Sequence, residues 1–472
     1  MASEDARTLR PNNPGGPIGV GPRALAAVGL VVFFVWQSFY PHAADFKTFY
    51  SAGFAIRHPE IPLYDLVALD ENPFGEVFKL PPSAALYVAP LTVLELQQAR
   101  FLWRLGLVAA LFAAYALLLH TVRVEALSWP WLAGLGAWAL FGPAQVAVGE
   151  GQWDPLLLLL LAVAAWGMQS SRPVVAGLAL AVAASIKPYP LIVAGVLVAR
   201  RWWRGLLAAL VGTVALVGTG SLVAGTEETW TFLTRVLPAS GATTPYVDNQ
   251  ALGGVLARLA VNDFKPVPLA GAPSVDLAVR AISAVVLALT IWLVGRRRAE
   301  SGDERAMQLA LFVPLSILLL PAAWTHYATI LLLPLTLVVA HRVRHAPRAW
   351  VVWVALGVAY VLLAIPNPTM LYGPEVDRAL WLRGRADAAN LALQREYATA
   401  LARLVFSYKA FATLLLFGLV AHCVAALRAM TTPSERAPEP RPRATTFGLA
   451  RAPSTATRTP SEAPRTPTGV IS

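Results

Sequence analysis

The sequence predicts an all-α polytopic integral membrane protein, and three observations lead to this prediction. Hydrophobic residues make up 57% of the 472 residues and charged residues only 14%, whereas soluble domains carry roughly 25% charged residues. The apolar residues stand in runs of about 17–25, the length that a helix needs to cross a bilayer. These runs lack the short alternating pattern of a membrane strand, so we expect them to be helices.

The first span is predicted at residues 24–41, after a Pro- and Gly-rich lead over residues 1–22. Its end is rich in bulky aromatic residues, which is typical of an interfacial belt and unlike the cleavage site of a secretory signal, so we expect the span to be retained. The segment 42–80 has too many breaks to cross the membrane. Several of its apolar residues fall roughly on one helical face, which predicts a short helix in the membrane interface. They are Phe46, Phe49, Tyr50, Phe54 and Ile56.

A further short apolar piece, 83–94, is predicted to be interfacial or re-entrant because it is too short to span comfortably. Eleven more runs bring the predicted number of spans to about twelve. They lie at about 99–120, 129–148, 153–169, 173–186, 188–200, 205–224, 276–295, 306–322, 325–341, 348–365 and 405–427. The membrane domain is therefore expected over 23–428, followed by a disordered, basic cytoplasmic tail over 429–472 that is rich in Pro, Ser, Thr and Arg.

The net charge of +11 is explained by topology, so no nucleic-acid partner is expected. Alternate crossing places three basic loops on the same side as the N-terminus, which the positive-inside rule assigns to the cytoplasm. They contain Arg200, Arg201 and Arg204; Arg296–Arg298 and Arg305; and His341, Arg342, Arg344 and Arg348. The opposite side receives the loops 42–98, 225–275 and 366–404, and the turns at 149–153, 187 and 323–325.

Asp45 opens the first of these outer loops, a few ångströms above the predicted hydrocarbon. A carboxylate is costly there unless it has a function or a partner. An N-cap of the following helix is one explanation, and a catalytic base is the other. The single cysteine, Cys423, excludes an intrachain disulfide.

Two other outer turns carry charges that a turn does not require. Gly149–Asp154 reads as a tight hairpin in which Asp154 caps the next helix, yet Glu150 and Asp154 both lie close to the bilayer. Lys187 either snorkels at a helix end or, because the charge rule disfavours a cation on this face, binds a phosphate.

The triplet Asp248-Asn249-Gln250 and the pair His326-Tyr327 complete the set of polar outer residues. Amides can orient sugar hydroxyls and a histidine can bind phosphate, although a loop and an interfacial histidine also occur for structural reasons. The sequence has no Gly-rich nucleotide loop, zinc-ligand spacing or Ser-His-Asp arrangement. A lipid-phosphate donor therefore suits these loops better than a cytosolic nucleotide sugar, and no cofactor is expected.

Seven short motifs in order resemble glycosyltransferase family 87, polytopic enzymes of the GT-C class. The resemblance covers roughly residues 24–341. The matching residues are Asp45-Phe46 with Tyr50, Ala52 and Gly53; Pro62-Leu63-Tyr64-Asp65; Pro81-Pro82 with Ala84-Ala85-Leu86 and Ala89-Pro90-Leu91; Gly151-Gln152; Lys187-Pro188; Asn249-Gln250; and His326-Tyr327. The chain departs from the family at Leu80, where an aromatic residue is usual before the Pro-Pro pair.

The resemblance implies a glycosyltransferase in a bacterial inner membrane, with its active site on the extracytoplasmic side. It implies a polyprenyl-phosphate sugar as donor, mannose first, and a glycolipid or lipid-linked glycan as acceptor. Asp45 would be the general base, and Lys187 and His326 would lie near the donor phosphate. Further substrate contacts are expected from Gln152, Asp154, Asn249, Gln250, Tyr50 and Tyr327.

The main alternative is a secondary transporter or lipid flippase, which would also have about twelve spans. A transporter should place polar residues near the midplane of its spans, whereas here they gather at one face. A noncatalytic scaffolding protein is the third reading. The sequence thus favours the transferase.

Overall fold

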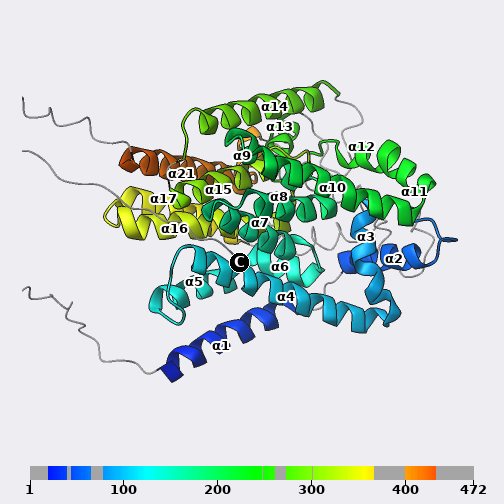
Figure 1. Ribbon diagram of the computed structural model, residues 1–472, viewed down its shortest axis with the longest axis horizontal. Helices are drawn as coiled ribbons and strands as arrows, with labels where there is room; N and C mark the ends of the chain where they lie inside the picture. Colours follow the sequence, from blue (N-terminus) through cyan, green and yellow to red (C-terminus); the bar gives the residue numbers. More distant parts are fainter. Residues whose placement is uncertain are drawn as a thin grey trace, which may run out of the picture. The chain divides into compact units, whose positions relative to one another are not determined.

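The computed structural model describes residues 20–39, 44–64, 78–246, 248–260, 273–299, 301–365 and 399–431. Every regular element in these ranges is helical, so the all-α prediction is confirmed (Figure 1). The chain divides into the units Met1–Thr431 and Thr432–Ser472. Nearly all of the predicted lead and of the predicted tail lie outside the described residues, as does most of the predicted loop 366–404. The first three residues of the predicted tail, 429–431, are instead the end of a helix.

The described elements follow one another along the chain. They are α1 (Val20–Ser38), α2 (Ala44–Arg57), α3 (Pro82–Val88), η2 (Ala89–Val93), α4 (Leu96–Thr121), α5 (Trp129–Ala139), α6 (Gly142–Glu150), α7 (Asp154–Gln169), α8 (Pro173–Ile186), η3 (Tyr189–Ile192), α9 (Gly195–Ala199), α10 (Trp203–Ala224), α11 (Thr226–Thr231), the π-helix η4 (Phe232–Val236), α12 (Leu237–Ser240), α13 (Leu252–Ala260), α14 (Pro273–Gly295), α15 (Gly302–Leu318), η5 (Thr325–Leu331), α16 (Leu332–His345), α17 (Trp350–Ala364), α20 (Ala400–Val405) and α21 (Tyr408–Thr431).

Six helices in the described ranges are long and apolar enough to cross a membrane, and a bent pair would make seven. The number of twelve spans stays a prediction. The bent pair is α5 and α6, which the sequence suggested as one span over 129–148 and which meet at 56°. Pro143 stands in the first turn of α6, where its ring and missing N–H prevent α5 from continuing.

Two other predicted spans are also interrupted. The run 188–200 is divided between η3 and α9, because Pro188 and Pro190 cannot donate to a regular helical ladder. The run 325–341 begins with the 3₁₀ segment η5 before α16 continues it. Both irregular segments lie at the turns that carry Lys187 and His326.

Helix α2 differs from the prediction in its environment. A short helix is present, but it is buried on nearly all sides and not only along one apolar face. It packs against α3, η2, α4 and α6. The small residues Ser51, Ala52 and Gly53 make this possible, since a Cβ on Gly53 would lie 2.9 Å from the backbone nitrogen of Ala89. The aromatic residues of α2 are therefore part of the protein core.

Helix α7 lies at the centre of the described part of the chain. It packs against α4, α8, α15 and η5. Its sequence is apolar on every face, as expected for a helix surrounded by other helices, and Leu157, Leu158 and Leu161 are fully buried. The N-terminus of α7 carries Asp154 into this core.

Helices α8 and α10 approach each other closely. A Cβ on Gly177 would lie only 2.0 Å from the carbonyl oxygen of Gly205. Small residues allow such backbone contact between membrane helices, where packing replaces the hydrophobic effect as the source of association. This contact holds α8, and the residues that follow it, against the rest of the helices.

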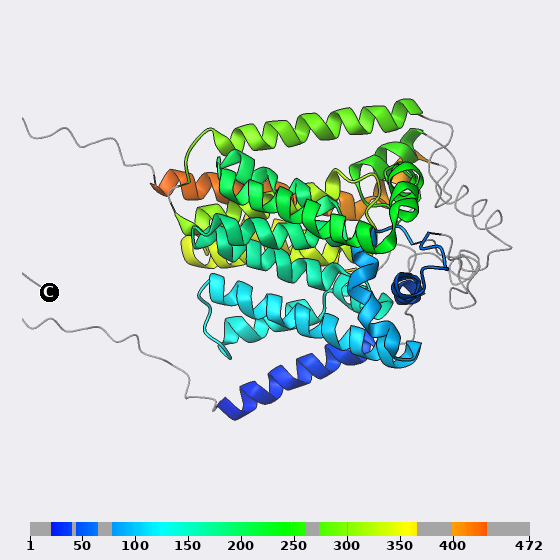
Figure 2. The same cartoon turned by 45° about the vertical axis from the view of Figure 1, so that its right-hand side comes forward.

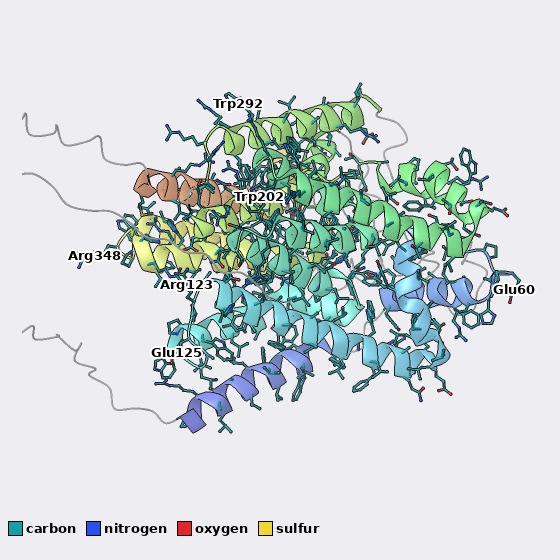
Figure 3. All side chains as sticks on the ribbon, viewed as in Figure 1. Glu60, Arg123, Glu125, Trp202, Trp292 and Arg348 are labelled. Carbon is teal, nitrogen blue, oxygen red and sulfur yellow. The ribbon has the colours of Figure 1, made fainter. Side chains whose placement is uncertain are left out.

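The polar loops separate to two ends of the helices, as the sequence predicts. Helices α2 and α3 lie at one end, whereas α1 begins and α21 ends at the other (Figures 1 and 2). Figure 3 places Glu60 at the first end and Arg123 and Arg348 at the second. At the second end Arg428 pairs with Glu304 at 3.0 Å, and Arg305 donates to the carbonyl oxygen of Met168.

Candidate active site

Asp45 lies in the first turn of α2, and aromatic contacts fix the helix that carries it. The Phe46 ring stacks on Trp103 of α4 with centroids 5.8 Å apart. The Tyr50 hydroxyl donates to the carbonyl oxygen of Leu94 at 2.8 Å. Tyr50, predicted as a substrate contact, therefore anchors α2 to the segment after η2. Asp45 itself is half-buried.

The turn between α6 and α7 places Gln152 beside Asp45. Gly151 ends α6 in the left-handed conformation, with φ of 77°, which glycine adopts without steric cost. The backbone N–H of Gln152 then returns to the carbonyl oxygen of Ala147 at 2.7 Å. The Gln152 side chain donates from Nε2 to Oδ2 of Asp45 at 2.5 Å.

Asp154 and Lys187 form a buried ion pair directly behind this contact. The Lys187 Nζ atom lies 3.0 Å from Oδ2 of Asp154 and donates to Oε1 of Gln152 at 3.2 Å. It also lies 4.3 Å from the centroid of the Tyr327 ring. The Tyr189 hydroxyl donates to the other oxygen of Asp154 at 3.3 Å.

Burial governs the electrostatics of Lys187, which is 3% exposed. Desolvation lowers the pKa of Lys187, and the charge and hydrogen bond of Asp154 oppose this shift. A buried charge is tolerable only when it is paired and hydrogen-bonded. Asp154 is fully buried and supplies that pairing.

His326 joins the cluster from η5. Its Nδ1 atom lies 3.4 Å from Oε2 of Glu150, and its Nε2 atom lies 3.8 Å from Oδ2 of Asp154. The neighbouring Tyr327 ring packs edge-on against the imidazole at 4.8 Å between centroids. The first turn of α2, the α6–α7 turn, the α8–η3 junction and η5 therefore converge on one polar site.

Asp248 lies next to this site. The Thr325 hydroxyl donates to Oδ1 of Asp248 at 2.6 Å. Desolvation raises the pKa of Asp248 to about 6, while the Thr325 hydrogen bond and the positive charge of Lys409 act in the opposite direction. A carboxyl group with such a pKa exchanges its proton close to neutral pH.

Asn249 and Gln250 instead hold the backbone of their loop. Asn249 donates to the carbonyl oxygens of Thr244 and Pro321 at 2.8 and 2.9 Å, and its Oδ1 accepts from two backbone N–H groups. Gln250 donates to the carbonyl oxygen of Phe406 and accepts from the backbone N–H of Lys409. Both residues are buried, and their contact with a substrate stays a prediction.

The structure thus brings together most of the predicted residues: Asp45, Gln152, Asp154, Lys187, His326 and Tyr327. Glu150, noted in the sequence as a charge that its turn does not require, and Tyr189 were not among the predicted substrate contacts. Glu150 stands in the same hairpin as Gln152, and Tyr189 follows Lys187 by two positions, so proximity in sequence was the available signal. Asp248 was singled out as a polar outer residue, but its contact with Thr325 could not be predicted from the sequence.

Two observations concern other kinds of site. Within the described ranges, no group of three or more His, Cys, Asp and Glu residues is placed to hold a metal ion. A small cavity lies at the end of the helices where α4 and α16 finish, lined by residues that include Gln169, Asp303 and His341. It is separate from the polar site around Asp45.

The sequence profile described as glycosyltransferase family 87 matches residues 78–321, more than half of the chain. The chain belongs to glycosyltransferase family 87. The match includes Gln152, Asp154 and Lys187 and begins after Asp45.

Two relatives of this family 87 protein extend the similarity. A polyprenol-phosphate-mannose-dependent alpha-(1-2)-phosphatidylinositol pentamannoside mannosyltransferase of Mycobacterium tuberculosis is 29% identical over an alignment of 372 residues that covers 73% of this chain and 80% of the relative. The protein of the same description from Mycolicibacterium smegmatis is 28% identical over 378 residues, 76% of this chain and 85% of the relative.

Solved structures give a weaker likeness. The crystal structure of ArnT from Cupriavidus metallidurans bound to undecaprenyl phosphate has a TM-score of 0.44 and 16% identity, over 87% of this chain and 79% of that chain. The apo structure of ArnT gives 0.36 and 18%, over 85% and 77%. At these scores the likeness carries no further conclusion.

Family membership decides between the classes that the sequence left open. This family 87 protein is an enzyme, a glycosyltransferase, and the reading as a transporter or scaffold is set aside. Its apolar helices make it a multi-pass membrane protein. The polar site around Asp45 is its candidate active site.

Proposed function

We propose that this enzyme transfers mannose from a polyprenyl-phosphate donor to a glycolipid acceptor on the extracytoplasmic face of a bacterial inner membrane. The names of the two mycobacterial relatives support the donor and suggest an acceptor related to phosphatidylinositol mannosides. The basic loops at the end opposite Asp45 support the membrane orientation.

In this proposal Asp45 is the general base. As the acceptor hydroxyl attacks the anomeric carbon of mannose, its proton passes to the Asp45 carboxylate. A bond forms between that carbon and the acceptor oxygen, while the bond to the phosphate oxygen breaks and polyprenyl phosphate leaves. One carboxylate is enough for inversion, because no second one need form a glycosyl-enzyme intermediate, unlike in retaining glycosidases.

The leaving phosphate gains negative charge during this step, and a nearby cation in a low-dielectric site would stabilise it. Of the two predicted residues we assign the phosphate contact to His326, as a hydrogen-bond donor through a ring N–H, because Lys187 already donates to both Asp154 and Gln152 at shorter distances.

The observation that carries the proposal is the position of Asp45. Its carboxylate is half-buried, is held by Gln152, and lies in a cluster that contains both Lys187 and His326. A plain helix N-cap would need none of these long-range partners.

The decisive experiment compares Asp45→Asn with the wild type in nanodiscs, using radiolabelled polyprenyl-phosphate mannose and a mycobacterial lipid extract. Asn keeps the size and an oxygen that can accept from Gln152, but it cannot take a proton. We expect transfer to fall about 10²–10⁴-fold at an unchanged melting temperature.

Glu60→Gln is the matched control, because it neutralises a carboxylate at the same end of the helices whose side chain is 69% exposed. It should transfer mannose at the wild-type rate. Near-normal transfer by Asp45→Asn would remove Asp45 from the mechanism. If the wild type transferred no label from polyprenyl-phosphate mannose but did transfer it from the corresponding glucose or arabinofuranose donor, the proposed donor would be wrong.

A further inference from the structure

Four side chains from three parts of the chain form a continuous line that ends at Asp45. Asp154 holds Nζ of Lys187 at 3.0 Å, Lys187 donates to Oε1 of Gln152 at 3.2 Å, and Gln152 donates to Oδ2 of Asp45 at 2.5 Å. Asp154, Lys187 and Gln152 are all buried. We define these four residues as the Asp45 relay.

The chemistry of the relay allows only one orientation of the Gln152 amide. Lys187 has donors and no acceptor, so it requires the oxygen of the amide, and the Asp45 carboxylate requires the nitrogen. A flipped amide would turn its NH₂ group toward the ammonium and its oxygen toward the carboxylate. Lys187 therefore selects the rotamer of Gln152 that can donate to Asp45.

Lys187 has little capacity left for a substrate. Its ammonium can make three hydrogen bonds, and it is surrounded by the oxygen of Asp154, the oxygen of Gln152 and the face of Tyr327, which attracts a cation. A donor phosphate would have to compete with these three partners, and drawing Lys187 away from Asp154 would remove the ammonium that neutralises a fully buried carboxylate, which is unfavourable.

We propose that Gln152 and Lys187 are positioning residues for Asp45, and that Lys187 acts on transfer through Gln152 and not by binding the donor phosphate. This inference rests on the proposed role of Asp45 as the base. Gln152 restricts rotation of the Asp45 carboxylate toward the acceptor. Because its hydrogen bond favours the ionised form of a carboxylate, Gln152 also keeps Asp45 ready to accept a proton at lower pH.

Other charged groups also face this line and will contribute to any pH profile. The negative charge of Asp45 interacts electrostatically with both Lys187 and His326. The remaining titratable groups around the relay are Glu150 on α6, Tyr189 on η3 and Tyr327 on η5. Variants must therefore be compared by the difference that each makes to the wild-type profile.

The test measures the pH dependence of transfer for Gln152→Leu, which has similar size but no hydrogen bond. We expect the rate of transfer at neutral pH to fall about 10-fold or more, with the KM for the donor unchanged. The acidic limb of the pH–rate profile should move to higher pH by about one unit, because Asp45 loses a hydrogen bond that favours its ionised form. Gln145→Leu is the control, since Gln145 lies on α6 but donates to the carbonyl oxygen of Ala139. It should leave the profile unchanged.

Lys187 is tested in the pair Lys187→Met with Asp154→Asn, which avoids leaving Asp154 unpaired. The pair should move the acidic limb in the same direction as Gln152→Leu, and combining the three changes should add little, because all act on one hydrogen bond. A raised donor KM with an unmoved acidic limb would instead make Lys187 a phosphate ligand and overturn the relay.

Failure of the relay and failure of the proposed base give different results. If Asp45→Asn abolishes transfer but Gln152→Leu leaves the acidic limb in place, the base stands and the relay is wrong. If Asp45→Asn keeps normal transfer, the base itself is wrong, whatever the Gln152 variant does.

Discussion

Gln152 donates to Oδ2 of Asp45 at 2.5 Å across 107 residues of sequence. The contact joins the first turn of α2 to the hairpin between α6 and α7. Neither segment could place the two side chains alone, because α2 is positioned by Phe46 and Tyr50, and the hairpin by Gly151. The position of Asp45, the proposed base, therefore depends on the close packing of Gly151 against Phe46.

Gly151→Ala should damage the site through this fit. Gly151 has φ of 77°, and a Cβ there would lie 2.7 Å from Cβ of Phe46. The strain of the left-handed backbone costs about 1–2 kcal/mol, and the clash must push α2 away from the hairpin. We expect a lower melting temperature and at least about a 10-fold loss of transfer, since small misplacements of catalytic groups are costly.

Gly149→Ala, two residues earlier, is the matched control. Its Cβ would lie 3.4 Å from the carbonyl oxygen of Ser38, and Gly149 has no positive φ. This variant should stay close to the wild type in both measurements. Equal behaviour of the two alanine variants would contradict the role assigned to the Gly151 turn.

Membrane orientation can be tested by cysteine labelling in intact cells, in a Cys423→Ala background. Ser240 is exposed near the end of the helices that carries Asp45, and Ser434 follows α21 in sequence. We expect an impermeant thiol reagent to label Ser240→Cys and to spare Ser434→Cys, because the positive-inside rule places the basic end in the cytoplasm. The reverse pattern would mean an inverted protein and a cytoplasmic donor site.

The helical fold and the two polar ends follow from simple physics, so the sequence predicted them. Long apolar runs must be helical in lipid, and alternate crossing sends Asp45, Gln152, Lys187 and His326 to one end. The positions of Pro143, Pro188 and Pro190 also mark where helices break, although the hydropathy of these runs concealed the breaks.

The environment of α2 and the side-chain partners within the site depend on tertiary contacts, which cannot be predicted from sequence patterns. The aromatic residues of α2 were assigned to a membrane surface, yet Phe46 and Tyr50 pack against α4 and the segment after η2. The sequence also predicts a substrate contact for Asn249, and in the structure four backbone groups already form hydrogen bonds with its amide. An amide in a loop has the same appearance in either role.

Asp248 should make the stability of the protein depend on pH in a defined direction. Its pKa is about 6 in the folded protein, against an ordinary value of 3.8. Between these values the folded state binds more protons than the unfolded state, so the free energy of unfolding falls as pH rises from about 4 to about 6. Above that range the ionised, desolvated carboxylate destabilises the fold by on the order of 3 kcal/mol at most.

Asp248→Asn removes this ionisation and keeps an oxygen that can accept from Thr325. The difference in melting temperature between the Asn variant and the wild type should therefore become more favourable to the variant as pH increases from 4.5 to 7.5. Subtracting the wild-type curve cancels the contributions of titrating groups that do not interact with Asp248, whereas Lys409 interacts with it and contributes to the difference. Glu60→Gln, with its exposed side chain, should show no such trend. A constant difference for Asp248→Asn across this range would mean that Asp248 does not titrate there, and that Lys409 and Thr325 hold its carboxylate in one protonation state.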